Sequence, residues 1–189
     1  MSAPGTHVAV AASCCLALLA LLRAAARARR IDVRPVLELR QHNLVVRLRF
    51  GELELARVVS ECTLASCGAI ATFSGTTRDS FEGRTVTSLA YEAYEPMALK
   101  EMAKACQSAR AQWPDLERVV VEHKLGQCPV TATSLLVVVA APHRASALDA
   151  VRFIVDELKR ATPIWKLEVY AQGAAAWKEN ASGGIETQM

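Results

Sequence analysis

Basic side chains stand at four places where a predicted helix or strand begins or ends. They are Arg78 after a strand, His143 and Arg144 before a helix, Lys159 in the last turn of that helix, and Lys166 at the start of the next strand. Arginine grips phosphate through parallel N–H donors. Lysine can stabilise a developing oxyanion, or transfer a proton when neighbouring cations lower its pKa. These residue types predict a site for an anionic substrate.

Each of these residues also has a purely structural explanation. Lys159 in a last helical turn is favoured by the helix dipole alone, and Lys166 beside Trp165 fits a strand lysine whose stem covers apolar surface. His143 fits a capping or core histidine. Arg144 opposes the dipole at a helix start, which is slightly unfavourable unless the free N–H groups there bind an anion. Spacing alone leaves open whether these side chains converge.

The charge distribution excludes a broad nucleic-acid surface. The net charge is +3, but residues 1–50 contain eight arginines and two acidic residues, so residues 51–189 are mildly acidic. Binding along a nucleic-acid backbone needs an extended basic face. A basic site in the later residues must therefore be a local cluster.

The cysteines and the N-terminal segment indicate the cellular compartment in which the protein is expected. The six cysteines form no C-x-x-C pair and no zinc pattern with histidine, which predicts free thiols and neither a metal nor a cofactor. The apolar run 7–22 is too short for a membrane span, and its positive charges follow it, unlike those of a secretory signal. We expect a cytosolic protein without a membrane segment. The Arg- and Ala-rich start also fits, loosely, a mitochondrial transit peptide.

Hydrophobic periodicity predicts alternating strands and helices from residue 44 onward. The predicted strands are 44–51, 67–75, 85–95, 116–126, 134–141 and 164–171, and the predicted helices are 52–61, 96–113 and 143–162. The wholly apolar run 134–141 indicates a central strand buried on both faces. Residues 76–84 are predicted as a loop, and a bulge is expected near Ser88. This order favours an α+β sandwich with helices packed on a mainly antiparallel sheet.

Four ordered motifs give the chain a family resemblance. "GAIATFSGTTRD", "LAYEAYEPMA", "APHRASALDAV" and "LKRATPIWKLE" resemble the large, catalytic subunit of molybdopterin synthase in its animal form, over about residues 50 to 180. The resemblance implies an α/β hammerhead fold with a smaller β-rich subdomain. We therefore divide the chain into a leader, 1–43, a catalytic domain, 44–180, and a tail, 181–189.

The family's activity is a sulfur transfer. The resemblance implies conversion of cyclic pyranopterin monophosphate to molybdopterin, a step in molybdenum cofactor biosynthesis. The sulfurs come from the thiocarboxylated C-terminal glycine of a small ubiquitin-like subunit. It also implies a heterotetramer, in which two large subunits form a central dimer and each binds one small subunit.

The resemblance also assigns residues. The family's substrate pocket matches Arg78, His143, Arg144, Lys159, Lys166 and Glu168, with Leu167 in the same stretch. Lys159 and Lys166 are the expected catalytic pair, and Lys159 is the first choice to engage the thiocarboxylate or the reacting carbons. His143 and Arg144 are assigned to the phosphate or the pterin, with Arg78 in support.

Some positions depart from the family pattern, and two other functions stay open. Leu167 stands where the family often has a basic residue, so it can contribute only backbone or apolar contact. Trp165 is expected to anchor the turn, while Pro163 swings Lys166 back toward Lys159. The alternatives are a stand-alone phosphate-ester enzyme that uses the same basic pocket, and a non-catalytic module that binds an anion or a partner there.

Overall fold

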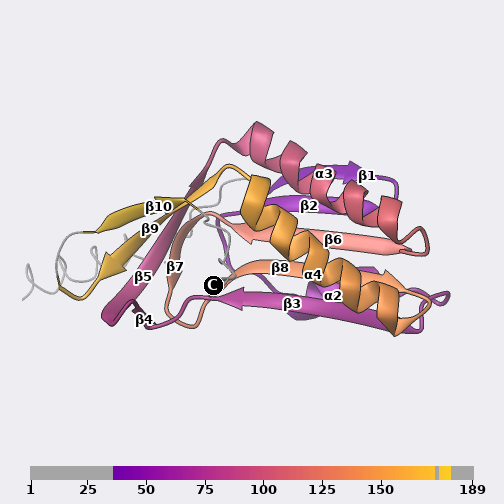
Figure 1. The fold of residues 1–189 in the computed structure, drawn as a ribbon, viewed down its shortest axis with the longest axis horizontal. Helices are drawn as coiled ribbons and strands as arrows, with labels where there is room; N and C mark the ends of the chain where they lie inside the picture. Colours follow the sequence, from indigo (N-terminus) through magenta and orange to yellow (C-terminus); the bar gives the residue numbers. More distant parts are fainter. Residues whose placement is uncertain (1–35, 173–174, 180–189) are drawn as a thin grey trace, which may run out of the picture. The chain divides into compact units, whose positions relative to one another are not determined.

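Two buried strands, each with three consecutive valines, form the centre of the main sheet. The computed structural model describes residues 36–172 and 175–179, and their elements all belong to the unit Arg34–Met189. The central strands β6 (Arg118–Lys124) and β8 (Thr133–Ala141) are buried along almost their whole length. The sheet order is β1-β2-β6-β8-β3 (Figure 1). Its other strands are β1 (Leu37–Gln41), β2 (Leu44–Arg49) and β3 (Ala69–Thr76).

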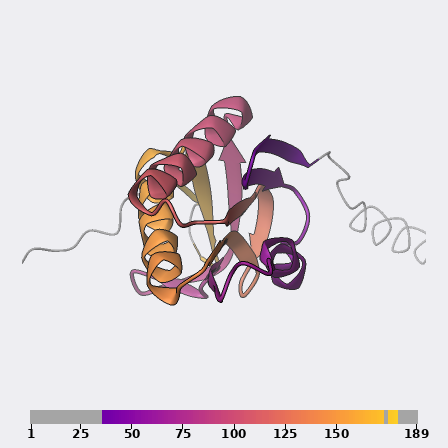
Figure 2. The ribbon, with the colours of Figure 1, turned by 90° about the vertical axis from the view of Figure 1, so that its right-hand side faces the viewer.

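Helices cover both faces of this sheet. α3 (Glu95–Gln112) and α4 (Arg144–Ala161) pack on one face and form the larger core with it, while α2 (Leu55–Cys62) packs on the other (Figure 2). A proline in the first turn of α3 fits its missing N–H. Thr162 ends α4 in an extended conformation, which is favoured by the proline that follows it.

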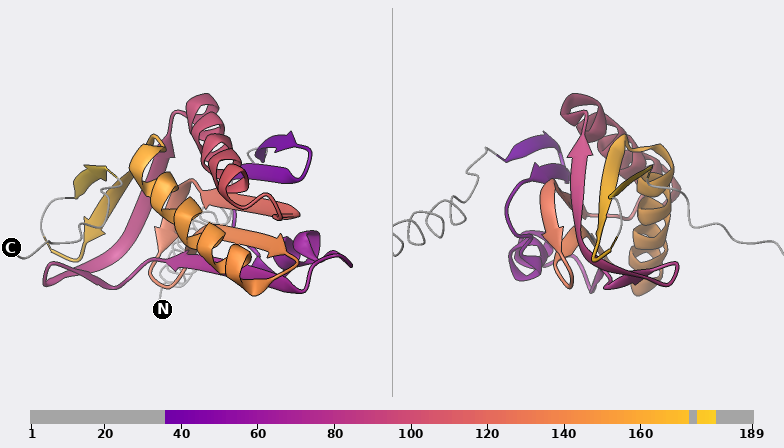
Figure 3. Two further views of the ribbon diagram at one scale, coloured as in Figure 1. Left: turned by 45° about the vertical axis from the view of Figure 1, so that its right-hand side comes forward. Right: turned by 90° about the vertical axis from the view of Figure 1, so that its left-hand side faces the viewer.

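A second, smaller sheet continues from one end of the first (Figure 3). Its order is β10-β9-β5-β4, all antiparallel, and β7 also pairs with β5. These strands are β4 (Ser80–Phe81), β5 (Arg84–Ala93), β7 (Gly126–Pro129), β9 (Ile164–Tyr170) and β10 (Ala176–Glu179). In the main sheet the β2–β6 pair is parallel, and β1–β2, β6–β8 and β3–β8 are antiparallel. The α+β class with a smaller β-rich part is confirmed.

Several predicted details are confirmed and several are wrong. The buried strand, the three predicted helices and the bulge between Val86 and Ser88 are present. The loop predicted over 76–84 contains β4 and a tight turn to β5, in which Glu82 and Gly83 have positive φ. The short strands β1, β7 and β10 were not predicted.

The described residues include part of the predicted leader, 1–43, and none of the predicted tail, 181–189. The strand β1 lies inside the segment 1–43 that the sequence assigned to a leader, and it pairs with β2. Residues 1–35, with the transit-peptide interpretation, and the tail 181–189 lie outside the described residues. No helix within the described ranges is both long and apolar enough to cross a bilayer.

Candidate functional site

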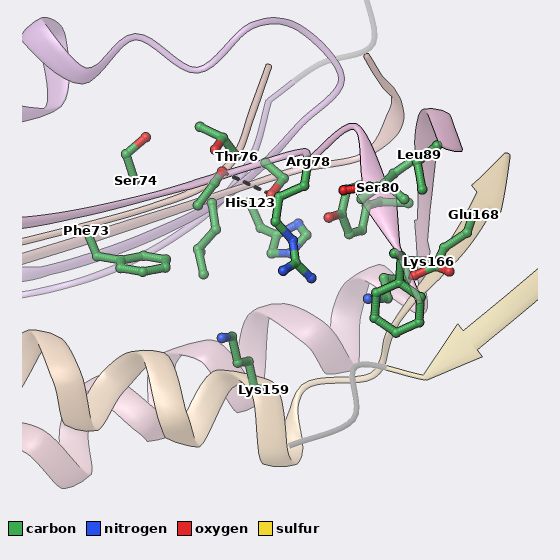
Figure 4. Close-up of a pocket in the computed structure, with 16 residues that line it drawn as sticks. Phe73, Ser74, Thr76, Arg78, Ser80, Leu89, His123, Lys159, Lys166 and Glu168 are labelled. Carbon is green, nitrogen blue, oxygen red and sulfur yellow. Dashed lines mark hydrogen bonds and ion pairs between the residues drawn. The ribbon is translucent and has the colours of Figure 1, made fainter. Parts of the chain in front are cut away.

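A pocket of about 430 Å³ opens where the two sheets meet. The end of β3 and the loop after it form one wall, and β4, β5 and β9 of the smaller sheet form another (Figure 4). The C-terminal part of α4 and the facing ends of β6 and β8 complete it. The site is therefore built from segments that are far apart in sequence and that only the packing of the two sheets brings together.

Three cationic side chains reach into this pocket from three different elements. Arg78 comes from the loop between β3 and β4, Lys159 from the last turn of α4, and Lys166 from β9. Their nitrogen ends point into the same space (Figure 4). The extended conformation at Thr162 reverses the chain direction, so that both lysines line one pocket although they lie on different elements. The expected convergence of these three residues is present.

One buried carboxylate balances part of this charge. Glu168 is 2% exposed, and its Oε1 lies 3.3 Å from Nζ of Lys166. Its Oε2 accepts a hydrogen bond from the hydroxyl of Tyr170. The ring of Phe81 lies 5.7 Å from the same ammonium nitrogen. Lys166 is thus held from two sides, whereas Arg78 and Lys159 are exposed cations that can meet an incoming anion.

An uncharged histidine, His123, also lines the pocket. It is 5% exposed and packs edge-to-face against Tyr91, with ring centroids 5.0 Å apart. Burial lowers the pKa of His123 from 6.5 to about 4, so the imidazole is neutral at pH 7. Nδ1 lies 2.8 Å from the carbonyl oxygen of Lys124, and since a carbonyl only accepts, Nδ1 carries the proton and Nε2 is left as an acceptor. The sequence analysis missed this residue, which the buried strand ending in "EHK" could have indicated.

His143 and Arg144 are not part of this pocket in a single chain. They are exposed at the N-terminal end of α4, whereas Lys159 lies at the other end of the same helix. An 18-residue helix is about 27 Å long. Of the six residues matched to the family's pocket, Arg78, Lys159, Lys166 and Glu168 line the pocket. His143 and Arg144 lie about a helix length away.

The side chains of Leu167 and Trp165 lie on the opposite face of the small sheet. Alternation along β9 directs Lys166 and Glu168 toward the pocket and their neighbours away from it. Leu167 pairs with Ala90 and with Trp177 of β10. Trp165 is 40% exposed, which does not fit the expectation that it anchors the turn, whereas its neighbour Ile164 is buried.

The pocket is suited to an anionic molecule with both polar and apolar parts. Three cations and one carboxylate leave an excess of positive charge, and Phe73, Phe81 and Leu89 offer apolar walls. Among the described residues, no group of three or more His, Cys, Asp or Glu side chains is arranged to hold a metal ion.

The fold and the pocket define a class of α+β proteins with a pocket lined by lysine and arginine side chains at a junction of two sheets. The family model for the MoaE protein matches residues 48–161, and the chain belongs to this family. Molybdopterin synthase catalytic subunit 1 of Aedes aegypti is 48% identical over 137 residues, which cover 71% of this chain and 88% of the mosquito protein. The resemblance inferred from the four motifs is therefore confirmed.

Solved structures show the same fold. Molybdopterin synthase from Staphylococcus aureus superimposes with a TM-score of 0.66 at 27% identity, covering 69% of this chain and 94% of the bacterial one. A complex of subunits 1 and 2 of the molybdopterin-converting factor from Helicobacter pylori 26695 contains a chain that matches with a TM-score of 0.57 at 21% identity, covering 67% and 85%. The second likeness concerns the fold alone.

Proposed function

We propose that this chain is the catalytic subunit of a molybdopterin synthase. It converts cyclic pyranopterin monophosphate to molybdopterin, with two sulfurs taken from the thiocarboxylated C-terminus of a small ubiquitin-like subunit. The observation that carries this proposal is the convergence of Arg78, Lys159 and Lys166 on one pocket, in a chain of the MoaE family. The proposed substrate brings a phosphate, and the carrier brings an anionic thiocarboxylate, so both reactants require cations.

The three cations differ in how they are held, which suggests a division of roles. Lys166 is fixed by Glu168 and by the ring of Phe81, so it suits the stabilisation of charge at a defined position as the cyclic phosphate opens. Lys159 is exposed at the pocket edge and suits contact with the thiocarboxylate or the reacting carbons. Arg78, on a loop, suits the phosphate.

His143 and Arg144 keep their proposed role in binding the phosphate or the pterin if the protein is a dimer. Their distance from Lys159 along α4 means that a chain does not supply them to its own pocket. We assign them to the pocket of a second large subunit, in a central homodimer that binds one small subunit per pocket. The two-subunit complex of the Helicobacter factor supports the partner, because that protein has the same fold.

Reconstitution tests this function. The full chain is mixed with thiocarboxylated small subunit and cyclic pyranopterin monophosphate, and molybdopterin is quantified. Lys159→Ala and Lys166→Ala are each expected to lower the rate on the order of 100-fold or more, because each removes a cation that stabilises negative charge in the pocket. Lys104→Ala, on the exposed face of α3, is the matched control and keeps the wild-type rate.

The same assay separates the two other functions. Wild-type rates in both pocket variants would overturn the assignment of the lysines. Release of phosphate from simple esters without the small subunit would favour a stand-alone phosphate-ester enzyme. Binding of the small subunit without conversion of the pterin would favour a non-catalytic module.

A further inference from the structure

The buried carboxylate of Glu168 has two partners, Lys166 in the pocket and Tyr170 outside it. Lys166, Glu168 and Tyr170 alternate along β9 and so project from one face of the small sheet. The first two line the pocket, whereas Tyr170 does not, and it is 7% exposed. The three side chains therefore form a row that leads from the pocket into the protein.

The two oxygens of Glu168 are divided between the other two members of this row. Oε1 faces the ammonium of Lys166 at 3.3 Å, and Oε2 accepts the proton of the Tyr170 hydroxyl. Hydrogen bonding to Glu168 raises the pKa of Tyr170, so the phenol keeps its proton and acts as the donor. Because a buried carboxylate needs such donors, this contact fixes which oxygen is left for the lysine.

The β4–β5 hairpin holds both ends of the row. The guanidinium carbon of Arg84 lies 3.4 Å from the centroid of the Tyr170 ring, and Phe81 packs beside the ammonium of Lys166. Arg84 on β5 and Phe81 on β4 are directly opposite each other across the hairpin. A cation over an aromatic face is attractive, so Arg84 restrains the ring whose hydroxyl binds Glu168.

We propose that Tyr170 is a positioning residue, which orients Glu168 and through it the ammonium of Lys166. This inference rests on the proposed function, since it gives Lys166 a fixed place at the reacting centre. Without the hydroxyl, the Glu168 carboxylate turns more freely and the ammonium loses its single position. Displacement of a catalytic group by about 1 Å can cost up to 100-fold in rate.

The substitution Tyr170→Phe removes the hydroxyl and keeps the ring under Arg84. In the reconstituted reaction we expect kcat to fall about tenfold with little change in KM, because the loss affects positioning rather than substrate binding. Tyr94→Phe is the matched control, because Tyr94 is 61% exposed and does not line the pocket. This variant should form product at the wild-type rate.

A double-mutant cycle separates positioning from general stabilisation. In a Glu168→Gln background, Tyr170→Phe should lower kcat less than twofold, because the tyrosine acts only through the carboxylate. Equal losses in both backgrounds, or a wild-type kcat for Tyr170→Phe, would overturn the inference. The variant Lys166→Ala separates failure of the proposed function from failure of this inference. If Lys166→Ala is active, the proposed role of Lys166 fails as well. If Lys166→Ala is inactive and the two substitutions of the cycle have additive effects, only the role of Tyr170 fails.

Discussion

Glu122 and Glu168 are both buried carboxylates, but Glu122 belongs to a structural cluster of ion pairs and Glu168 positions a lysine of the pocket. Glu122 is fully buried on the α2 side of the main sheet, where Arg47 and Arg57 donate to it at 2.7–2.8 Å. Arg47 also binds Glu61, so each charge has several fixed partners. Such a cluster secures the packing of α2 and leaves no group to react. Glu168 instead binds Lys166 at a pocket wall while it accepts from Tyr170, and this keeps the ammonium of Lys166 in place and accessible from the pocket.

The buried imidazole of His123 makes the stability of the protein depend on pH. Its pKa is lowered from 6.5 to about 4 by burial, so between these values the unfolded chain binds a proton that the folded protein does not. Stability therefore falls as the pH falls from 6.5 toward 4. Between pH 7 and 4.5 the loss should be about 2 kcal/mol, measurable by urea unfolding at a series of pH values.

The variant His123→Phe is the control for this pH dependence. It keeps an aromatic ring against Tyr91 but cannot take up a proton, so its stability should change less across the same window. The carboxyl groups of Glu38, Glu61 and Glu157 have pKa values below their usual 4.5, so their contributions are lost only at lower pH. A wild-type protein that is equally stable at pH 7 and 4.5 would contradict the neutral state of His123.

At the level of single residues, sequence reasoning identified the three pocket cations and the buried Glu168, but neither His123 nor Tyr170. Arg78, Lys159 and Lys166 were found from their positions at element ends and from the resemblance. His123 and Tyr170 were missed because they lie inside strands, where an alternating pattern explains them equally well as core residues. The folded structure shows what these side chains face: His123 packs against the ring of Tyr91, and the Tyr170 hydroxyl donates to Glu168.

Among the secondary-structure elements, the passage from β6 to β7 connects the two sheets through one glycine. Gly126 has φ of 74° and begins β7, which pairs with β5 of the smaller sheet. A side chain in this left-handed conformation costs about 1–2 kcal/mol. Gly126→Ala should therefore lower the free energy of unfolding by about this amount.

A second glycine provides the comparison for this substitution. A Cβ added at Gly51 would meet nothing within 4 Å, and this residue does not have a positive φ. Gly51→Ala should leave the unfolding midpoint in urea within error of the wild type. If Gly126→Ala were as stable as Gly51→Ala, the left-handed connection between the sheets would not constrain the fold.

Long elements were predictable from sequence and short ones were not. α3 and α4 carry apolar residues at helical spacing over many turns, and β8 is a long buried run with three consecutive valines. β4 has two residues and β7 and β10 have four each, too few to show a period. Tertiary pairing with β5 and β9 creates these strands, and β4 is the one that brings Phe81 to the pocket.

For the whole molecule, the length of α4 separates two parts of the proposed site. His143 and Arg144 lie at its start and Lys159 in its last turn, so a single chain presents these groups at two separate places. In a dimer with two-fold symmetry, the start of α4 in one chain can face the pocket of the other, and the reverse holds by symmetry. The proposed site is then complete only between two chains.

This arrangement predicts that two inactive variants restore activity when they share a dimer. In a Lys159→Ala/Arg144→Ala mixed dimer, one pocket carries both defects and the other carries none. With random pairing of equal amounts, about a quarter of the wild-type rate of molybdopterin formation should return. Lys159→Ala with Lys166→Ala is the control, since both residues belong to the same chain's pocket and every pocket of the mixed dimer stays defective. Co-expression with two tags isolates the mixed dimer; if the Lys159→Ala/Arg144→Ala pair is as inactive as the control pair, His143 and Arg144 do not act across the dimer.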